Sequence, residues 1–360
     1  MKVLFITKND VDDINGGAMA SRRNLECIQD IFGKENVVFH LIVTKQQQNL
    51  LDRIRNFFGK LFYDKIDPSF SKLGICPDDY DILFIDRSLM GWNIRQLKRN
   101  GYQGKIISFF HNCEFDYNLM FVKKNDTIGN RLYLRSIKAN ETWTLMHSDA
   151  CVFINERDRA RMKELYGIEA KDETVITMTL RDKFQEGTVS VATNKNVKPL
   201  YTILGSYFLP NIEGIKWFIE NVYPHVNIRL RIIGKNMHLL RSEIKNKEIE
   251  ILSNVPDLTH YMVESDYMLY PIFDGSGMKI KTCEALMWGK NIVGTPEAFS
   301  GYGITDYSKV GACCETAEEF IEIINSLNMP KFNQWNRQFY KDNFSYEKSV
   351  NLYQKLINRL

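Results

Sequence analysis

The sequence has no long apolar run. Stretches such as Val3–Ile6 and Val37–Phe39 are far shorter than the roughly 20 residues of a membrane-spanning helix. The apolar run that follows the N-terminal Met-Lys ends at Thr7, which is shorter than the 7–15-residue core of a signal peptide. The sequence therefore predicts no membrane-spanning helix and no signal peptide, and we expect a cytoplasmic protein.

Paired cysteines, an excess of one charge and turn-rich composition are also lacking. The 7 cysteines form an odd set without a CxxC pair, so they predict neither a disulfide scaffold nor a metal cluster. The 47 Lys and Arg against 44 Asp and Glu give a net charge of +3, which is too small to indicate a nucleic-acid partner. With 21 Gly and 9 Pro, the composition excludes collagen-like and low-complexity chains.

What is present is the composition of a globular protein, 360 residues long and 44% hydrophobic, which predicts two domains at about 100–200 residues each. Apolar, β-branched runs alternate with segments of helical period, as in parallel α/β proteins. The polar stretch between Phe184 and Pro199 marks the expected boundary. We therefore predict an N-terminal domain over 1–183, a C-terminal domain over 184–345, and a final amphipathic helix over about 346–360 that completes the first domain.

The predicted strands and helices follow from local patterns. Strands are expected in the first half at Val3–Ile6, Val37–Val43, Ile82–Ile85, Ile106–Phe110 and Ala150–Ile154, and in the second half at Tyr201–Leu204, Ile228–Ile232, Tyr267–Ile272 and Asn291–Gly294. The first helix should end at Gly33, and Thr316 with Glu319 forms a capping box for a later one.

One loop of the second half has the features of an anion site. The segment 270–277 (YPIFDGSG) leaves a strand and leads into a helix that carries Lys279 and Lys281 near its start. Gly275 and Gly277 allow close backbone approach, and lysines there oppose the helix dipole unless an anion binds. A diphosphate would suit this loop; the alternative is a solvated basic turn with a Lys281–Glu284 pair.

Glu284 lies on the same helix, on the side of an apolar stripe formed by Ile280, Cys283 and Met287. A carboxylate in such surroundings needs partners. The two hydroxyls of a ribose would serve, and so would a salt bridge to a neighbouring lysine.

These residues resemble a known family. The stretch 254–303 (NVPDLTHYMVESDYMLYPIFDGSGMKIKTCEALMWGKNIVGTPEAFSGYG) is similar to the donor-binding half of retaining glycosyltransferases of the GT-B fold, family 4, and 205–224 (GSYFLPNIEGIKWFIENVYP) resembles the start of the same domain. The resemblance implies two Rossmann-like domains that face each other across a cleft, with a nucleotide-sugar bound between them.

The resemblance also implies roles for individual residues. His111, Lys279 and Lys281 match catalytic positions, the histidine lying against the transferred sugar and the lysines holding the diphosphate. Glu284 matches the glutamate that binds the ribose. The remaining positions that match donor-binding segments are Gly16, Gly17, Asn254, Val255, Gly275, Ser276, Gly277 and Met278.

Two departures from the family pattern are present. Position 276, eight before Glu284, is a serine where the family has a second glutamate that supports the transferring sugar, and the basic residues that many members carry are absent from 206–211. Two alternatives to a transferase therefore stay open. One is a non-catalytic GT-B-like subunit that binds a partner transferase, and the other is a GT-B-fold nucleotide-sugar epimerase.

His111 follows the strand 105–110 at its carboxyl end, where an open sheet places its active-site groups. The alternative is a loop histidine with a structural hydrogen bond. Glu114 and Asp116 nearby could bind acceptor hydroxyls or cap a helix.

Motifs for other chemistries are weak or absent. Asp10 with Asp12, and Asp79 with Asp81, form DxD strings, but two carboxylates at this spacing arise often by chance. With lysines and a helix N-terminus available, we expect no metal and no other cofactor, since the nucleotide-sugar is a co-substrate. Neither GxxxxGK[ST] nor GxGxxG occurs.

The segment 51–62 (LDRIRNFFGKLF) places Leu51, Ile54 and Phe58 on one helical face beside basic residues. Such a helix could lie on an anionic membrane surface, or simply pack on its own domain. Together these features predict a cytoplasmic glycosyltransferase. If the segment 51–62 lies on a membrane, the enzyme would bind peripherally at its inner face. It would move a hexosyl unit from a nucleotide-sugar to a saccharide or lipid-linked saccharide in surface polysaccharide synthesis, with retention and without metal.

Overall fold

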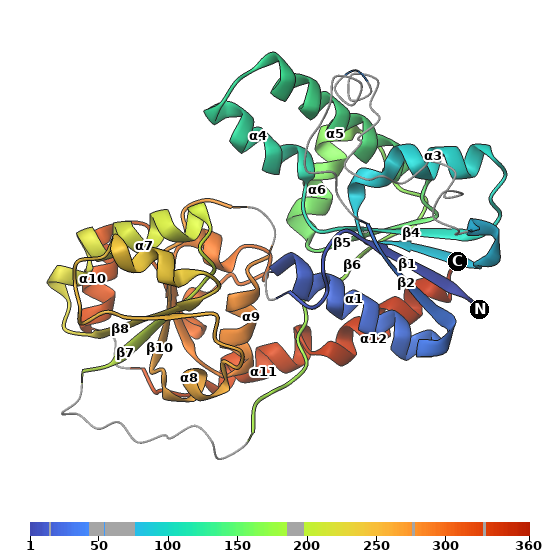
Figure 1. Ribbon diagram of the computed structural model, residues 1–360. Coiled ribbons are helices and arrows are strands. Elements are labelled where there is room, and N and C mark those ends of the chain that lie inside the picture. Colours follow the sequence, from blue (N-terminus) through green and yellow to red (C-terminus); the bar gives the residue numbers. More distant parts are fainter. Residues whose placement is uncertain (14–15, 43–53, 55–75, 186–197, 276–277, 327–328) are drawn as a thin grey trace. The chain divides into compact units, whose positions relative to one another are not determined.

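The computed structural model describes residues 1–13, 16–42, 54, 76–185, 198–275, 278–326 and 329–360. The chain forms two compact units (Figure 1). The N-terminal domain comprises Met1–Thr177 and Ser349–Leu360, and the C-terminal domain comprises Met178–Lys348. The sequence places the boundaries a few residues later and earlier, at 183/184 and 345/346.

The N-terminal domain is built on a six-stranded sheet in the order β2-β1-β3-β4-β5-β6, and all of its strand pairs are parallel. The strands are β1 (Val3–Thr7), β2 (Val37–Leu41), β3 (Ile82–Ile85), β4 (Lys105–Phe110), β5 (Ala150–Phe153) and β6 (Glu173–Val175). The helices are α1 (Gly16–Phe32), α3 (Gly91–Arg99), α4 (Glu114–Lys124), α5 (Ile128–His147), α6 (Glu156–Tyr166) and α12 (Tyr346–Ile357), of which α12 belongs to this domain from Ser349 onward.

The central strands of this sheet, β1, β3, β4 and β5, are buried on both faces. Leu4 and Leu83 point to one face, where they pack with Ile94 of α3. On the other face the ring of Phe84 stacks on Phe5 at 4.9 Å and meets Tyr353 of α12 edge-on at 5.7 Å. Parallel sheets require such covering on both sides, and the last helix of the chain provides part of it.

The C-terminal domain repeats this architecture with the strand order β12-β11-β10-β7-β8-β9, again parallel throughout. The strands are β7 (Leu200–Leu204), β8 (Arg229–Gly234), β9 (Glu250–Ser253), β10 (Tyr267–Tyr270), β11 (Asn291–Gly294) and β12 (Gly311–Cys313). The helices are α7 (Leu209–Asn221), α8 (Thr259–Glu264), α9 (Ile280–Met287), α10 (Ala317–Ser326) and α11 (Gln334–Asn343), with short 3-10 turns such as η7 (Pro296–Phe299).

The core of this domain lies between the sheet and the two helices α7 and α10. Ile203 and Leu269 of the sheet pack with Phe218 of α7 and Phe320 of α10, all of them buried. Helix α11 packs on the segment that contains α9, where Arg337 donates a hydrogen bond to the Met287 carbonyl at 3.0 Å. Helix α9, which carries the candidate anion site, is thus fixed by packing as well as by its own loop.

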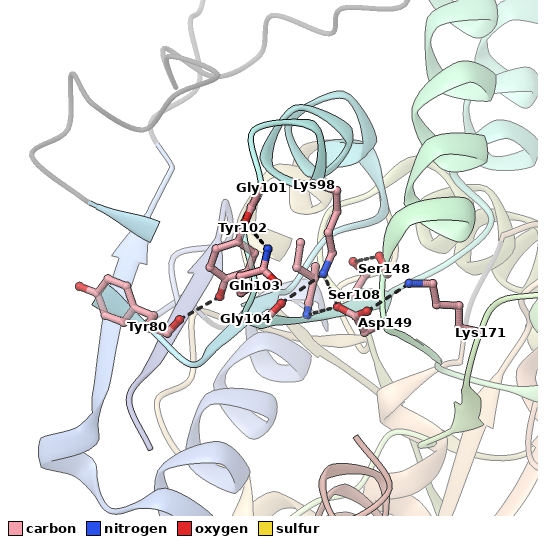
Figure 2. Close-up of polar contacts among 11 residues, drawn as sticks. Tyr80, Lys98, Gly101, Tyr102, Gln103, Gly104, Ser108, Ser148, Asp149 and Lys171 are labelled. Atoms are coloured by element: carbon pink, nitrogen blue, oxygen red, sulfur yellow. Dashed lines mark hydrogen bonds and ion pairs between the residues drawn. The ribbon is translucent and has the colours of Figure 1, made fainter. Parts of the chain in front are cut away.

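The amino edge of the N-terminal sheet is held by a polar network around Asp149 (Figure 2). The carboxylate accepts hydrogen bonds from Lys98 at 2.7 Å and from the backbone N–H of Ile106 at 2.9 Å, and Lys171 lies 3.3 Å from it. Ser108 and Ser148 join β4 to the turn before β5 at 2.8 Å. This edge is therefore filled by structural contacts, and the opposite, carboxyl edge carries the candidate site residues.

The structure confirms the predicted α/β architecture with two Rossmann-like domains. Helix α1 ends at Phe32 before Gly33, whose φ of 85° lies in the left-handed region. The capping box also forms, since the Thr316 hydroxyl accepts from the N–H of Glu319 at 3.3 Å and the Glu319 carboxylate accepts from the N–H of Thr316 at 3.4 Å.

Candidate functional site

The loops that follow β7, β10 and β11 bring the candidate residues of the C-terminal domain together. All three strands are parallel neighbours, so their carboxyl ends share one edge of the sheet. Lys279 is the N-cap residue of α9, which follows β10, and Lys281 and Glu284 lie in its first turns. Lys279, Lys281 and Glu284 are therefore positioned on one short helix at the edge where open parallel sheets bind their ligands.

Lys281 is held by a residue far away in the sequence. Its ammonium donates a hydrogen bond to the side-chain carbonyl of Asn211 on α7 at 2.8 Å. The absence of a side chain at Gly205, directly after β7, makes room for this contact: a Cβ there would lie 3.1 Å from the Asn211 Cγ and 3.2 Å from the Lys281 Nζ. The backbone carbonyl of Lys281 accepts from the Tyr270 hydroxyl at 2.9 Å.

The charged forms of Lys281 and Glu284 are both disfavoured in this surrounding. Burial lowers the pKa of Lys281 to about 7; the charge of Lys279 adds to this effect and that of Glu284 opposes it. Burial likewise raises the pKa of Glu284 to about 7, although Lys183 and Lys281 counteract it. Residues with strongly shifted pKa values are frequent at functional sites, because a bound ligand can supply the charge partners and hydrogen bonds that water provides at an exposed position.

Glu284 has too few partners within the protein. Among the described residues none donates a hydrogen bond to its carboxylate, and the neighbouring lysines act on it only through their charge. A buried carboxylate without donors is costly to maintain. Hydroxyl groups of a ligand would supply the missing donors.

Lys279 forms an ion pair that the sequence does not predict. Its ammonium lies 2.6 Å from the carboxylate of Glu297 in η7, the turn that follows β11. Both side chains are only partly accessible, at 12% and 19% of their surface. The Gly275 loop runs beside this pair, since a Cβ at Gly275, whose φ is 142°, would lie 3.3 Å from the Lys279 Nζ. The first cation of the predicted pair is thus balanced by a carboxylate.

The start of α9 is fixed by hydrogen bonds with the segment after β11. The Tyr302 hydroxyl donates to the Lys279 carbonyl at 2.7 Å and accepts from the Cys283 N–H at 3.0 Å. The Thr282 hydroxyl donates to the Ala298 carbonyl at 2.7 Å. The backbone that carries both lysines is therefore held before any ligand binds.

Other predicted donor-binding residues are spread over this domain. Met278 is buried beside the lysines, whereas Ser276 and Gly277 lie outside the described residues. Asn254 and Val255 follow β9, at the far end of the sheet. Asn254 has a φ of 57°, and its side-chain carbonyl accepts from the N–H of Asn236 at 3.0 Å. This contact shapes the loop that the resemblance assigns to the base.

In the N-terminal domain, His111 lies directly after β4, as predicted. Its Nε2 is 3.1 Å from the carboxylate of Asp86, which follows β3 and is 1% exposed. Asp86 also accepts hydrogen bonds from three side chains, those of Thr7 at 2.9 Å, of Asn24 at 2.7 Å and of Ser21. Asp86 is not among the residues predicted from the sequence, although its place after a buried strand follows the same rule that selects His111.

The other candidates of this domain are placed as follows. Gly16 and Gly17 form the N-terminus of α1, where the Gly17 carbonyl accepts from Asn9 at 3.4 Å. Glu114 begins α4, and its side chain accepts from Asn118 at 3.2 Å. Asp116 pairs with Arg161 through two hydrogen bonds of 2.6 and 3.0 Å, so its carboxylate already has a structural partner.

A further buried carboxylate, Glu141 of α5, lies behind the Glu114 segment. It accepts from the backbone N–H groups of Glu114 and Phe115 at 3.0 and 3.2 Å and from the Tyr166 hydroxyl at 2.6 Å. Burial raises the pKa of Glu141 to about 8, and these donors oppose the rise. Glu141 thereby binds the N-terminus of α4 from inside the domain.

The DxD strings have local roles. The Asp10 carboxylate accepts from the N–H of Asp12 at 3.1 Å, and that of Asp81 accepts from the N–H of Lys2 at 2.7 Å. Within the ranges that the structure describes, no three His, Cys, Asp or Glu residues form a metal-binding group. In the same ranges no helix is long and apolar enough to cross a membrane. The segment 51–62, apart from Ile54, lies outside them.

The C-terminal domain is similar to a known protein family. Residues 198–328 match the family model described as glycosyl transferases group 1, so the region that carries the candidate site is also the region that matches. No curated protein matches the chain.

Solved structures show the fold of the whole chain. Sucrose-phosphate synthase from Thermosynechococcus elongatus has a TM-score of 0.71 at 11% identity, with both chains fully covered. HepE from Anabaena in complex with UDP-glucose has 0.68 at 11%, also with full coverage of both. WaaG, a glycosyltransferase involved in lipopolysaccharide biosynthesis, has 0.64 at 14%, over 97% of this chain and 99% of its own. The chain has the two-domain GT-B fold, and the group 1 match in its C-terminal domain supports an enzyme of the transferase class.

Proposed function

We propose that this glycosyltransferase-like chain transfers a hexosyl unit from a nucleotide-sugar to a saccharide or lipid-linked saccharide, with retention of configuration and without a metal. One observation carries the proposal. The start of α9 combines two lysines with a buried carboxylate, Glu284, that lacks donors among the described residues. A nucleotide diphosphate offers both missing parts, an anion for the lysines and ribose hydroxyls for the glutamate.

The lysines would act on the leaving group. As the glycosidic bond to the donor breaks, negative charge develops on the departing diphosphate, and Lys279 and Lys281 would stabilise it from fixed positions. Because burial lowers the pKa of Lys281 to about 7, an approaching diphosphate would also restore its positive charge. Preorganised cations of this kind supply the charge neutralisation for which other transferases use a metal ion.

The base would be read by the backbone of the loop at Asn254 and Val255, and the glycines at 16 and 17 would approach the phosphates and the acceptor. His111, held 3.1 Å from the buried Asp86, is proposed to act on the transferred sugar. The acceptor residues Glu114 and Asp116 remain predictions, and Asp116 would have to share its carboxylate with Arg161.

A role in surface polysaccharide synthesis is supported by fold similarity to WaaG, which acts in lipopolysaccharide biosynthesis. UDP and UDP-glucose are bound in HepE structures of the same fold, so uridine donors are the first to test. A cytoplasmic location, and contact of segment 51–62 with the inner face of a membrane, remain predictions.

The direct test is product formation from UDP-, ADP-, GDP- and dTDP-sugars with saccharide and lipid-linked acceptors, in the presence and absence of EDTA. Acceptor-dependent donor consumption that EDTA leaves unchanged, with a product of retained anomeric configuration by NMR, is the expected result. Conversion of a donor without acceptor would favour an epimerase instead, and donor binding without any turnover would favour a non-catalytic subunit.

A further inference from the structure

Glu297 has no role in the proposed function so far, although its carboxylate lies inside the candidate anion site. It contacts Lys279 at 2.6 Å from the loop after β11, a strand that neighbours β10 in the sheet. A carboxylate beside a cation that binds phosphate weakens the binding of an anion, because it repels the ligand and neutralises its partner. Its presence therefore calls for a ligand group that a carboxylate would bind.

Four charged side chains at the start of α9 and in the loop after β11 form a series. Glu297 pairs with Lys279, the charge of Lys279 acts on Lys281, and Lys281 acts on Glu284 together with Lys183. The order is carboxylate, ammonium, ammonium, carboxylate. Residues 279 to 284 span about 7.5 Å along the helix axis at 1.5 Å per residue.

A nucleotide-sugar has a matching order of groups. The hydroxyls of the ribose are followed by two phosphates and then by the hydroxyls of the sugar. Carboxylates accept from hydroxyls and ammonium groups donate to phosphate oxygens. With the ribose on Glu284 and the diphosphate on the lysines, the hydroxyl-bearing sugar falls at the Glu297 end of the series.

We propose that Glu297 binds hydroxyl groups of the transferred sugar and so distinguishes the intact nucleotide-sugar from the nucleoside diphosphate. This inference rests on the proposed function, because it takes the same site and the same donor class. The Glu297 side chain is 19% exposed, and the ion pair with Lys279 fixes its carboxylate beside the predicted position of the diphosphate. The same carboxylate would favour release of the diphosphate once the sugar has been transferred.

The test compares paired ligands on one variant, Glu297→Gln, by calorimetric titration. The pairs are UDP with UDP-glucose, ADP with ADP-glucose, GDP with GDP-mannose and dTDP with dTDP-glucose. Loss of the charge should tighten the nucleoside diphosphate about threefold, since one repulsive charge is removed. It should weaken the nucleotide-sugar about tenfold or more, since a charge-assisted hydrogen bond is lost. The exposed Glu318→Gln on α10 is the matched control and should change neither.

The outcomes separate the two proposals. Opposite changes for the two members of a pair support the assignment of Glu297. If both members weaken equally, Glu297 only positions Lys279 and the inference is overturned, while the proposed function stands. If no pair binds the wild-type protein, the proposed function fails and this inference fails with it. Tighter binding of the nucleoside diphosphate by the variant would also show that the variant is folded.

Discussion

Replacement of Lys281 by Met should stabilise the protein while it removes the proposed function. The structure supplies the magnitude, because burial lowers the pKa of Lys281 from its ordinary 10.5 to about 7. This shift makes the charged form about 5 kcal/mol less favourable in the folded protein than in the unfolded chain. Methionine fills a similar volume, and loss of the hydrogen bond to Asn211 costs about 1 kcal/mol. The expected gain below pH 7 is therefore about 4 kcal/mol.

The pH dependence gives this prediction its sign. Between about pH 7 and 10.5 the folded state binds fewer protons at Lys281 than the unfolded state, so the stability of the lysine protein rises with pH. The advantage of methionine should shrink by about 1.4 kcal/mol per pH unit in this window. Because Glu284 also has a pKa of about 7, the comparison is made between the variant Glu284→Gln and the double variant Glu284→Gln/Lys281→Met. The difference in their free energies of unfolding then reports the titration of Lys281 alone.

The assay is urea unfolding at pH 6, 7, 8 and 9, followed through chemical labelling of the buried thiols of Cys283 and Cys314. Both cysteines belong to the C-terminal domain, so the measurement reports that domain and avoids a two-state treatment of the whole chain. A variant that is no more stable than its reference at pH 6, or a difference that stays constant with pH, would refute the view of Lys281 as a desolvated cation.

Three further predictions concern the same residues and their surroundings. Lys281 and Glu284 both have a pKa of about 7, so binding of a nucleotide-sugar should cause proton uptake by Lys281 at pH 8 and proton release from Glu284 at pH 6. Calorimetry in buffers of different ionisation enthalpy measures this exchange, and no exchange at either pH would contradict these values. Asp86→Ala leaves three buried donors without an acceptor and should lower the free energy of unfolding by about 3 kcal/mol in urea titrations. The exposed Asp78→Ala should lower it by less than about 0.5 kcal/mol, and similar losses in the two variants would count against the buried network. Gly205→Ala should weaken nucleotide binding several-fold, because the new Cβ displaces the flexible end of Lys281, and should lower the free energy of unfolding by less than about 1 kcal/mol. Unchanged affinity in a calorimetric titration with nucleotide would show that this close approach is unimportant.

The fold could be predicted from the sequence because its central strands are buried on both faces. Strands such as Ile82–Ile85 consist of four consecutive apolar residues and are visible as such. The strands that the sequence analysis missed are Glu173–Val175, Glu250–Ser253 and Gly311–Cys313, all at sheet edges. Edge strands are short and covered less completely, so their side chains carry a weaker apolar signal.

The site could be predicted only where its residues are close in the sequence. Lys281 and Glu284 could be predicted because they lie on one helix that begins directly after a strand and a glycine-containing loop. Asn211 lies 70 positions before the lysine that it binds, and Glu297 lies 18 positions after its partner. Contacts of this kind arise from the order of the strands in the sheet, which no local pattern specifies.

The central claim is that the lysines at the start of α9 bind the diphosphate of a nucleotide. It is tested most directly by calorimetric titration of UDP, GDP, dTDP and ADP into the wild-type protein and the double variant Lys279→Ala/Lys281→Ala. The exposed pair Lys245→Ala/Lys247→Ala in the same domain serves as the control. We predict that at least one nucleotide binds the wild type and the control alike, and binds the site variant about 100-fold more weakly, as loss of two charge-assisted contacts implies. Equal affinity of the site variant and the wild type would contradict the claim.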